Sequence, residues 1–203
     1  MQEEDAGKAL EIISEFANVG AGNAATALAS LLDIELVNEV TSCKLLPIAD
    51  MGEWLGGNEQ VVAGMYTQLC GDLRSGVLVI FPEASANTLV RHMSQEEADL
   101  SNLSKLQMSA LCEAGNICLC WYLVAVSKMI DTDLVPAPPG AAVDLLGAVL
   151  DIPLATLGTS VDRVIAVHTI FRGVDRIFEG YFLLLPEGET LDVIMKKVGD
   201  IPK

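Results

Sequence analysis

Hydrophobic residues recur at intervals of three and four positions along two long stretches of the chain, 6–32 and 103–129. This spacing places them on one face of an α-helix, so the pattern predicts two long amphipathic helices. Four shorter stretches rich in β-branched and aliphatic residues follow them in two pairs: 61–69 with 76–81, and 164–171 with 180–185. Because a short turn joins each pair, we expect antiparallel hairpins.

Shorter elements are predicted around these hairpins, in the same order in each half. Extended pieces are expected at 35–46 and 133–135, and short helices at 49–55 and 140–150. A further short helix closes each half, at 85–93 and 189–198, where a glutamate soon after a proline suits a helix start. The plan of helix, extended piece, short helix, hairpin and short helix therefore occurs twice.

Two sequence motifs also recur. Glu15 with Asn18 is matched by Glu113 with Asn116, 98 residues later, and we call these pairs the first and second motifs. A strand segment that runs from glycine to Pro-Glu occurs at 76–83 and again at 180–187, 104 residues later. Because two matches in one order are rare by chance, we infer an internal duplication with halves of about 1–100 and 101–203.

The two halves are expected to share one core. No Ser/Gly-rich or charge-rich linker separates them, so we predict a single domain, residues 1–203, made of two repeats. The fold class is α/β, or α+β in stricter usage, with pseudo-two-fold halves whose long helices pack on a shared antiparallel sheet.

Composition and charge narrow the possible partners and the compartment. The 203 residues are 51% hydrophobic, which is enough for a sizeable core. Twelve basic against 28 acidic residues give a net charge of −16, so neither nucleic acid nor an anionic membrane surface is expected as a partner. Five cysteines, an odd number without a basic signal sequence, suggest reduced thiols in the cytoplasm.

Neither membrane insertion nor a metal site of the chain's own is predicted. The longest charge-free run, 16–32, spans 17 residues and contains several polar side chains, whereas a membrane-spanning helix needs about 20 predominantly apolar residues. Cys118 and Cys120 form a C-x-C pair, but both histidines are distant from it in sequence. No Ser-His-Asp grouping has support from spacing, and His168 is interpreted as a structural residue.

The Glu–Asn motifs carry the chemistry that the sequence suggests. Residues three and four apart share one face of a helix. Two stripes result: Glu11, Glu15, Asn18 and Gly22, and Ser109, Glu113, Asn116 and Cys120. Asparagine has no useful pKa, but its amide can orient a water molecule, and glutamate can pair with a cation. This combination suits phosphoryl transfer, which depends on alignment and charge stabilisation. An ordinary exposed helix face is the alternative interpretation.

The segments around both motifs carry a family resemblance. The string N-V-G-A-G-N-A-A-T-A-L, residues 18–28, resembles the first signature helix of the CheC/CheX/FliY family of bacterial and archaeal chemotaxis phosphatases. The second family signature reads D/S-x3-E-x2-N-x22-P, and the chain matches it at every spacing with Ser109, Glu113, Asn116 and Pro139. The resemblance covers essentially the whole chain.

The first half departs from the family pattern in two places. Glu15 and Asn18 are present, but Glu11 stands where Asp or Ser is usual. Thr41 stands where the proline would fall, and Pro47 follows six residues later. Among the family members, a chain with two signatures and without an added flagellar-switch domain is closest to CheC.

The resemblance implies hydrolysis of the aspartyl phosphate of a CheY-type response regulator. By family analogy, Asn116 and Asn18 would orient the attacking water, while Glu113 and Glu15 would pair with the active-site lysine of the receiver. The Mg²⁺ ion would belong to the phosphorylated receiver, so no cofactor of this chain's own is expected.

The resemblance also implies a second partner, the receptor deamidase CheD. In the family, the surface that binds CheD is associated with the short helix of the second half. In this chain the candidate contact there is Asp151, with Asp144 nearby. Plain solvation of an exposed helix face is the alternative for both aspartates. The alternative function is a non-catalytic chemotaxis adaptor that binds CheD or phosphorylated CheY.

Overall fold

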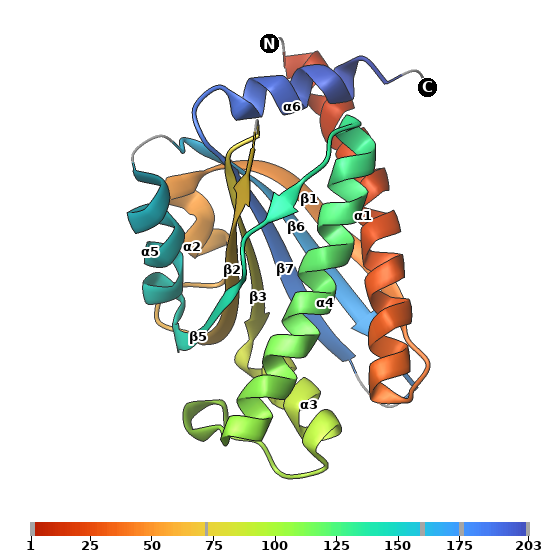
Figure 1. The fold of residues 1–203 in the computed structure, drawn as a ribbon, viewed down its shortest axis with the longest axis vertical. Coiled ribbons are helices and arrows are strands. Elements are labelled where there is room, and N and C mark those ends of the chain that lie inside the picture. Colours follow the sequence, from red (N-terminus) through yellow and green to blue (C-terminus); the bar gives the residue numbers. More distant parts are fainter. Residues whose placement is uncertain (1–2, 72, 159–160, 175–176, 202–203) are drawn as a thin grey trace.

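Two long helices lie side by side and antiparallel over one face of a sheet in the computed structural model, which describes residues 3–71, 73–158, 161–174 and 177–201 (Figure 1). The helices of this layer are α1 (Glu3–Leu32) and α4 (Lys105–Ile130), with α3 (Glu83–Ser94) and α6 (Thr190–Gly199) at opposite ends. The other face is covered by α2 (Met51–Trp54) and α5 (Leu146–Leu157). Two short 3₁₀ helices are also present, Ile48–Asp50 and Leu100–Asn102.

The described residues form seven strands in one antiparallel sheet. They are β1 (Val37–Pro47), β2 (Val61–Cys70), β3 (Ser75–Pro82), β4 (Val135–Pro136), β5 (Gly140–Leu145), β6 (Arg163–Arg172) and β7 (Ile177–Pro186). The strand order is β1-β6-β7-β3-β2-β4, and β5 also pairs with β2 on the same side as β4. The predicted mixed fold with an antiparallel sheet is confirmed.

The sheet separates two hydrophobic cores. On β3, Val77 and Val79 belong to the core beneath α1 and α4, whereas Leu78 and Ile80 belong to the core beneath α2 and α5. A central strand with both faces covered reads as an unbroken apolar run rather than as an alternation of apolar and polar residues. The long helices therefore pack on the sheet with one side, and their opposite side faces outward.

The predicted helix at 140–150 is wrong in its first half. Gly140–Leu145 forms strand β5, and helix α5 begins only at Leu146. The small residues of this segment lie along β2 in a continuous register from Gly140 opposite Tyr66 to Leu145 opposite Val61. As a strand, this segment pairs with the backbone N–H and C=O groups along the open edge of β2, which a helix at the same place would leave unpaired. Tertiary context therefore decides its conformation.

The strand motif used to infer the duplication does not align equivalent positions. Val77 and Val79 pack beneath α1 and α4, but the residues 104 positions later, Tyr181 and Leu183, pack beneath α2 and α5. Because successive strand residues point to opposite faces, equivalence by face requires an odd offset. The element order and the strand order still correspond between the halves. The duplication and the two-repeat division stay a prediction.

Helix α4, a segment that the search for charge-free runs did not single out, passes a test of length and composition for a membrane span. Its 26 residues are long and apolar enough to cross a membrane by length and composition, although Glu113 interrupts its charge-free run. A central core helix passes the same test, and α4 packs against α1, α3 and the sheet. Its apolar character therefore has a structural explanation within this fold.

A buried hydrogen bond joins the hydroxyl groups of Tyr122 on α4 and Thr169 on β6. We expect Tyr122→Phe and Thr169→Val each to lower the free energy of unfolding by about 1–3 kcal/mol, because each leaves a buried hydroxyl without its partner. The double variant removes both hydroxyls, so it should cost less than the sum of the two. Urea denaturation of the four proteins measures this, and strictly additive costs would contradict the interaction.

Candidate functional site

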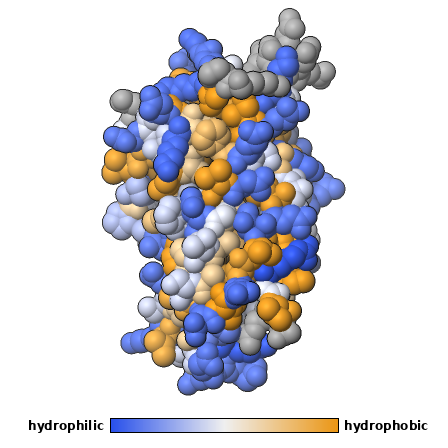
Figure 2. Space-filling view, turned by 90° about the vertical axis from the view of Figure 1, so that its right-hand side faces the viewer, coloured by the Kyte–Doolittle hydropathy of each residue, from blue (hydrophilic) through white to orange (hydrophobic). Residues whose placement is uncertain are grey.

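Both motifs lie on the outer faces of the two long helices. Glu15 and Asn18 on α1 are exposed, as is Glu113 on α4, while Asn116 is half-buried. Figure 2 shows the side of the molecule that carries α1, where hydrophobic and near-neutral residues run along the middle between hydrophilic ones. The motif side chains are therefore available to another molecule rather than enclosed in a cavity.

The close approach of the two helices separates the motifs. A Cβ atom on Gly20 would lie 3.1 Å from the Cβ of Ala125 and 3.3 Å from the carbonyl oxygen of Trp121, so Gly20 marks the crossing of α1 and α4. Asn18 precedes Gly20 on α1, and Asn116 precedes Trp121 on α4. Because the helices run antiparallel, the motifs lie on opposite sides of the crossing (Figure 1). The two motifs are therefore spatially separate and form two candidate sites rather than one combined candidate site.

Two of the three supporting signature residues lie on the long helices, close to the motifs. Glu11 and Ser109 are exposed, one helical turn before Glu15 and Glu113 respectively. They therefore extend each motif along its helix and are available to the same docked molecule.

The signature position occupied by Pro139 lies at an irregularity of an edge strand. Between β4 and β5, residues 137–139 stand opposite only two residues of β2. At the other edge, Thr41 is the extra residue where the register of β1 against β6 shifts. Thr41 and Pro139 are 98 residues apart, as the two motifs are. An unpaired edge position tolerates proline, which has no N–H to offer to a ladder.

The two cysteines of the C-x-C pair have different environments. Cys118 is buried, and burial raises the pKa of its thiol to about 12. Cys120 is exposed, and its Sγ lies 3.7 Å from Oδ1 of Asn116. Partial burial, and then the charge of Glu113, raise the pKa of the Cys120 thiol. The thiol of Cys120 therefore keeps its proton at neutral pH beside the second motif.

Sequence reasoning missed a polar chain centred on His168. Its Nδ1 lies 2.7 Å from Oγ1 of Thr41, its Nε2 lies 2.7 Å from Oε2 of Glu179, and its ring stacks on Tyr181. These contacts join β1, β6 and β7 on the face of the sheet opposite the motifs. The signal that links them is strand register, which becomes visible only once β1 is known to pair with β6.

Asp151 and Asp144 are both exposed, on α5 and at the end of β5. One carboxylate oxygen of Asp144 accepts a hydrogen bond from the backbone N–H of Leu145 at 2.7 Å. Because α5 covers the other face of the sheet, these two aspartates lie apart from both motifs. A partner docked on α5 would therefore leave the faces of α1 and α4 accessible.

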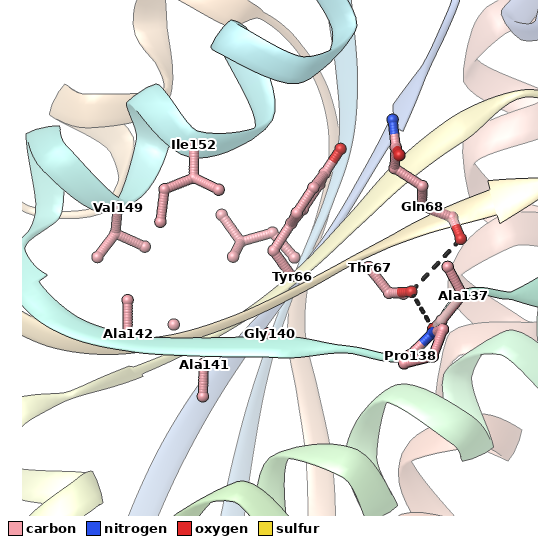
Figure 3. A pocket seen from close by; sticks show the side chains of 12 residues that line it. Tyr66, Thr67, Gln68, Ala137, Pro138, Gly140, Ala141, Ala142, Val149 and Ile152 are labelled. Atoms are coloured by element: carbon pink, nitrogen blue, oxygen red, sulfur yellow. Dashed lines mark hydrogen bonds between the residues drawn. The ribbon is translucent and has the colours of Figure 1, made fainter.

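A cavity of about 270 Å³ lies between α5 and the strands β2 and β5. Figure 3 shows Val149 and Ile152 of α5 facing Ala142, with the Tyr66 ring beside them. None of the described residues that line it is charged, so it does not suit a phosphoryl group. No group of three or more His, Cys, Asp or Glu within the described ranges is placed to hold a metal ion.

No protein-family model matches the chain. It is 29% identical over 195 residues to the Bacillus subtilis (strain 168) protein named CheY-P phosphatase CheC, which covers 94% of this chain and 93% of that protein. Its fold is similar to that of Thermotoga maritima FliY, with a TM-score of 0.72 at 15% identity over 97% of this chain and 95% of the other.

A second solved structure has the same fold. The FliM middle domain from H. pylori gives a TM-score of 0.63 at 11% identity over 97% of this chain and 99% of that domain. At such identities the two structures show a shared fold alone. The resemblance to the CheC/CheX/FliY family that the signature helices indicated is confirmed, by sequence over nearly the whole chain and by fold.

Proposed function

We propose that this chain hydrolyses the aspartyl phosphate of a CheY-type response regulator in chemotaxis. The supporting observation is the exposure of Glu–Asn motifs on the outer faces of α1 and α4, where a second protein can reach them. A site on a convex helix surface is completed by its substrate, which suits a protein substrate. The similarity to a protein named CheY-P phosphatase CheC points in the same direction.

The proposed roles follow from the chemistry of the side chains. Asn116, and Asn18 at the first motif, would orient the attacking water in line with the leaving oxygen, because an amide offers both an acceptor and donors. Glu113 and Glu15 would pair with the active-site lysine of the receiver. Mg²⁺ would come with the phosphorylated receiver and neutralise charge on the phosphoryl group. Free cysteines suit the reducing cytoplasm as the compartment.

The direct test is the loss of phosphate from a labelled receiver. A CheY-type receiver would be phosphorylated on its aspartate in excess Mg²⁺, and the decay would be followed with and without this chain. Acceleration at substoichiometric concentration supports catalysis by turnover. An unchanged decay rate across several receivers would contradict the phosphatase proposal and favour the non-catalytic adaptor.

The second proposed interaction is with the deamidase CheD, through α5. Asp151 is exposed on this helix beside Ile152, which is 38% exposed, and together they offer a charged and an apolar contact. This surface favours a docking role that is independent of the motifs. It is also the observation that supports the adaptor as a second candidate function.

Asp151→Lys is expected to weaken CheD binding at least about tenfold, because reversing a charge in a contact surface opposes an arrangement that favours the partner. Isothermal titration with purified CheD measures this. Glu35→Lys, an equal charge reversal at an exposed position after α1, serves as the control and should bind as the wild-type chain does. Equal affinities for both variants would remove Asp151 from the proposed surface.

A further inference from the structure

We propose that the thiol of Cys120 holds the side chain of Asn116 in one rotamer and thereby makes the second motif the faster of the two sites. This inference rests on the proposed function, in which Asn116 orients the attacking water. Cys120 is thus a positioning residue that acts through Asn116.

The contact joins two residues one helical turn apart on α4. The Sγ atom of Cys120 lies 3.7 Å from Oδ1 of Asn116, a hydrogen-bond distance when sulfur is the donor. A thiol donates weakly, and a carbonyl oxygen has two lone pairs. Oδ1 can therefore accept from the thiol and still accept from a water molecule. The restraint fixes the plane of the amide without consuming its capacity to position water.

The protonation of the thiol allows this donation. Partial burial and the neighbouring Glu113 both disfavour the thiolate and raise the pKa of Cys120. Burial is the larger cause, and the charge of Glu113 adds to it in favouring the protonated thiol that can donate. The three side chains act as one arrangement on a single face of α4.

The first motif lacks this restraint. Gly22 occupies the position four residues after Asn18, so no side chain is present to donate. Asn18 is exposed, and among the described residues its side chain makes no hydrogen bond. An amide free to change rotamer must be ordered each time a water is positioned, which costs conformational entropy. The structure assigns the better preorganised amide to Asn116.

Serine and alanine at position 120 separate positioning from simple space filling. Serine keeps a hydrogen-bond donor at nearly the same place, whereas alanine removes the donor and keeps only the Cβ atom. In an Asn18→Ala background, only the second motif contributes to turnover. Cys120→Ala is expected to lower kcat about three- to tenfold, the range of an ordinary net hydrogen bond, with little change in KM. Cys120→Ser is expected to restore kcat to within about twofold.

The reverse experiment uses the first motif in an Asn116→Ala background. A Cβ atom on Gly22 would meet only Oδ1 of Asn38, at 3.5 Å, so the site has room for a small side chain. Gly22→Ser introduces a donor near Asn18 and is expected to raise kcat of the first site. Gly22→Ala is the matched comparison, because it adds the same Cβ atom without a donor, and Gly22→Ser is expected to exceed it in kcat.

A measurement without turnover keeps this inference separate from the proposed function. Nuclear magnetic relaxation of the Asn116 side-chain amide, assigned by its loss in Asn116→Asp, reports its mobility. We expect greater mobility in Cys120→Ala and wild-type mobility in Cys120→Ser. Equal mobility in Cys120→Ala and wild type overturns the inference even if the chain is an active phosphatase. Greater mobility with undiminished kcat overturns the catalytic consequence. If wild type leaves the receiver untouched, the proposed function fails, and mobility alone still decides the restraint.

Discussion

Asn18→Ala combined with Asn116→Ala is expected to abolish the acceleration of phosphate loss from a CheY-type receiver. Asn116→Ala alone should lower kcat roughly four- to tenfold, because the first motif still turns over at the slower rate expected of a less restrained amide. The double variant holds no attacking water in line at either motif, so it loses the remaining activity as well. Asn18→Ala alone should cost less, since Asn18 is the more exposed and less restrained amide. Initial rates of phosphate loss, measured over a range of receiver concentrations, give kcat and KM for all three variants.

The fold should survive these changes, because truncating an exposed or half-buried polar side chain usually costs within about 0.5 kcal/mol. Asn23→Ala, a half-buried asparagine of α1 outside the first stripe, is the matched control and should keep wild-type activity. A folded double variant with undiminished turnover would contradict the role given to both amides. Complete loss in Asn116→Ala alone would make the first motif a docking surface rather than a second catalytic site.

Gly20→Val is expected to destabilise the protein by about 1–3 kcal/mol, because the crossing of α1 and α4 has no room for a side chain. Even a Cβ atom there would lie 3.3 Å from the carbonyl oxygen of Trp121 and from Cα of Tyr122, both backbone atoms that move only with α4. The larger valine must push the helices apart. Because both motifs sit on this pair of helices, kcat should also fall.

Gly22→Ala, two residues further along the same helix, is the control for this prediction. Its new methyl group would make only an ordinary contact, at 3.5 Å from Oδ1 of Asn38. Replacing glycine by alanine inside a helix stabilises by roughly 0.5–1 kcal/mol. Chemical denaturation should therefore move the two midpoints in opposite directions. A Gly20→Val protein as stable as wild type would show that the crossing can accommodate bulk.

The long helices and the hairpins could be predicted because their periodicities of 3.6 and 2 are properties of local sequence. The boundary at Leu146 could not, since Gly140–Leu145 becomes a strand only through pairing with β2. The strand motif misled for a related reason. Matching letters at 76–83 and 180–187 carry no information on register, and one position of slip exchanges the two faces of the sheet.

The candidate site was found from spacing, but its restraint was not. The stripe on α4 follows from helix geometry, so Glu113, Asn116 and Cys120 were expected on one face. Whether the thiol reaches the amide depends on side-chain rotamers, which sequence spacing does not determine. The contacts of His168 also depend on strand pairing, because its partners Thr41 and Glu179 lie 127 and 11 residues away in sequence on other strands.

The two broken edge strands have a consequence for solubility. An open sheet exposes unpaired backbone groups at each edge, and a long, flat edge can pair with a second molecule and start aggregation. Here one edge bends at Thr41, and the other is interrupted at residues 137–139, with Pro136, Pro138 and Pro139 lacking N–H donors. These interruptions shorten the regular strand edge that a second molecule of this 51% hydrophobic chain could extend.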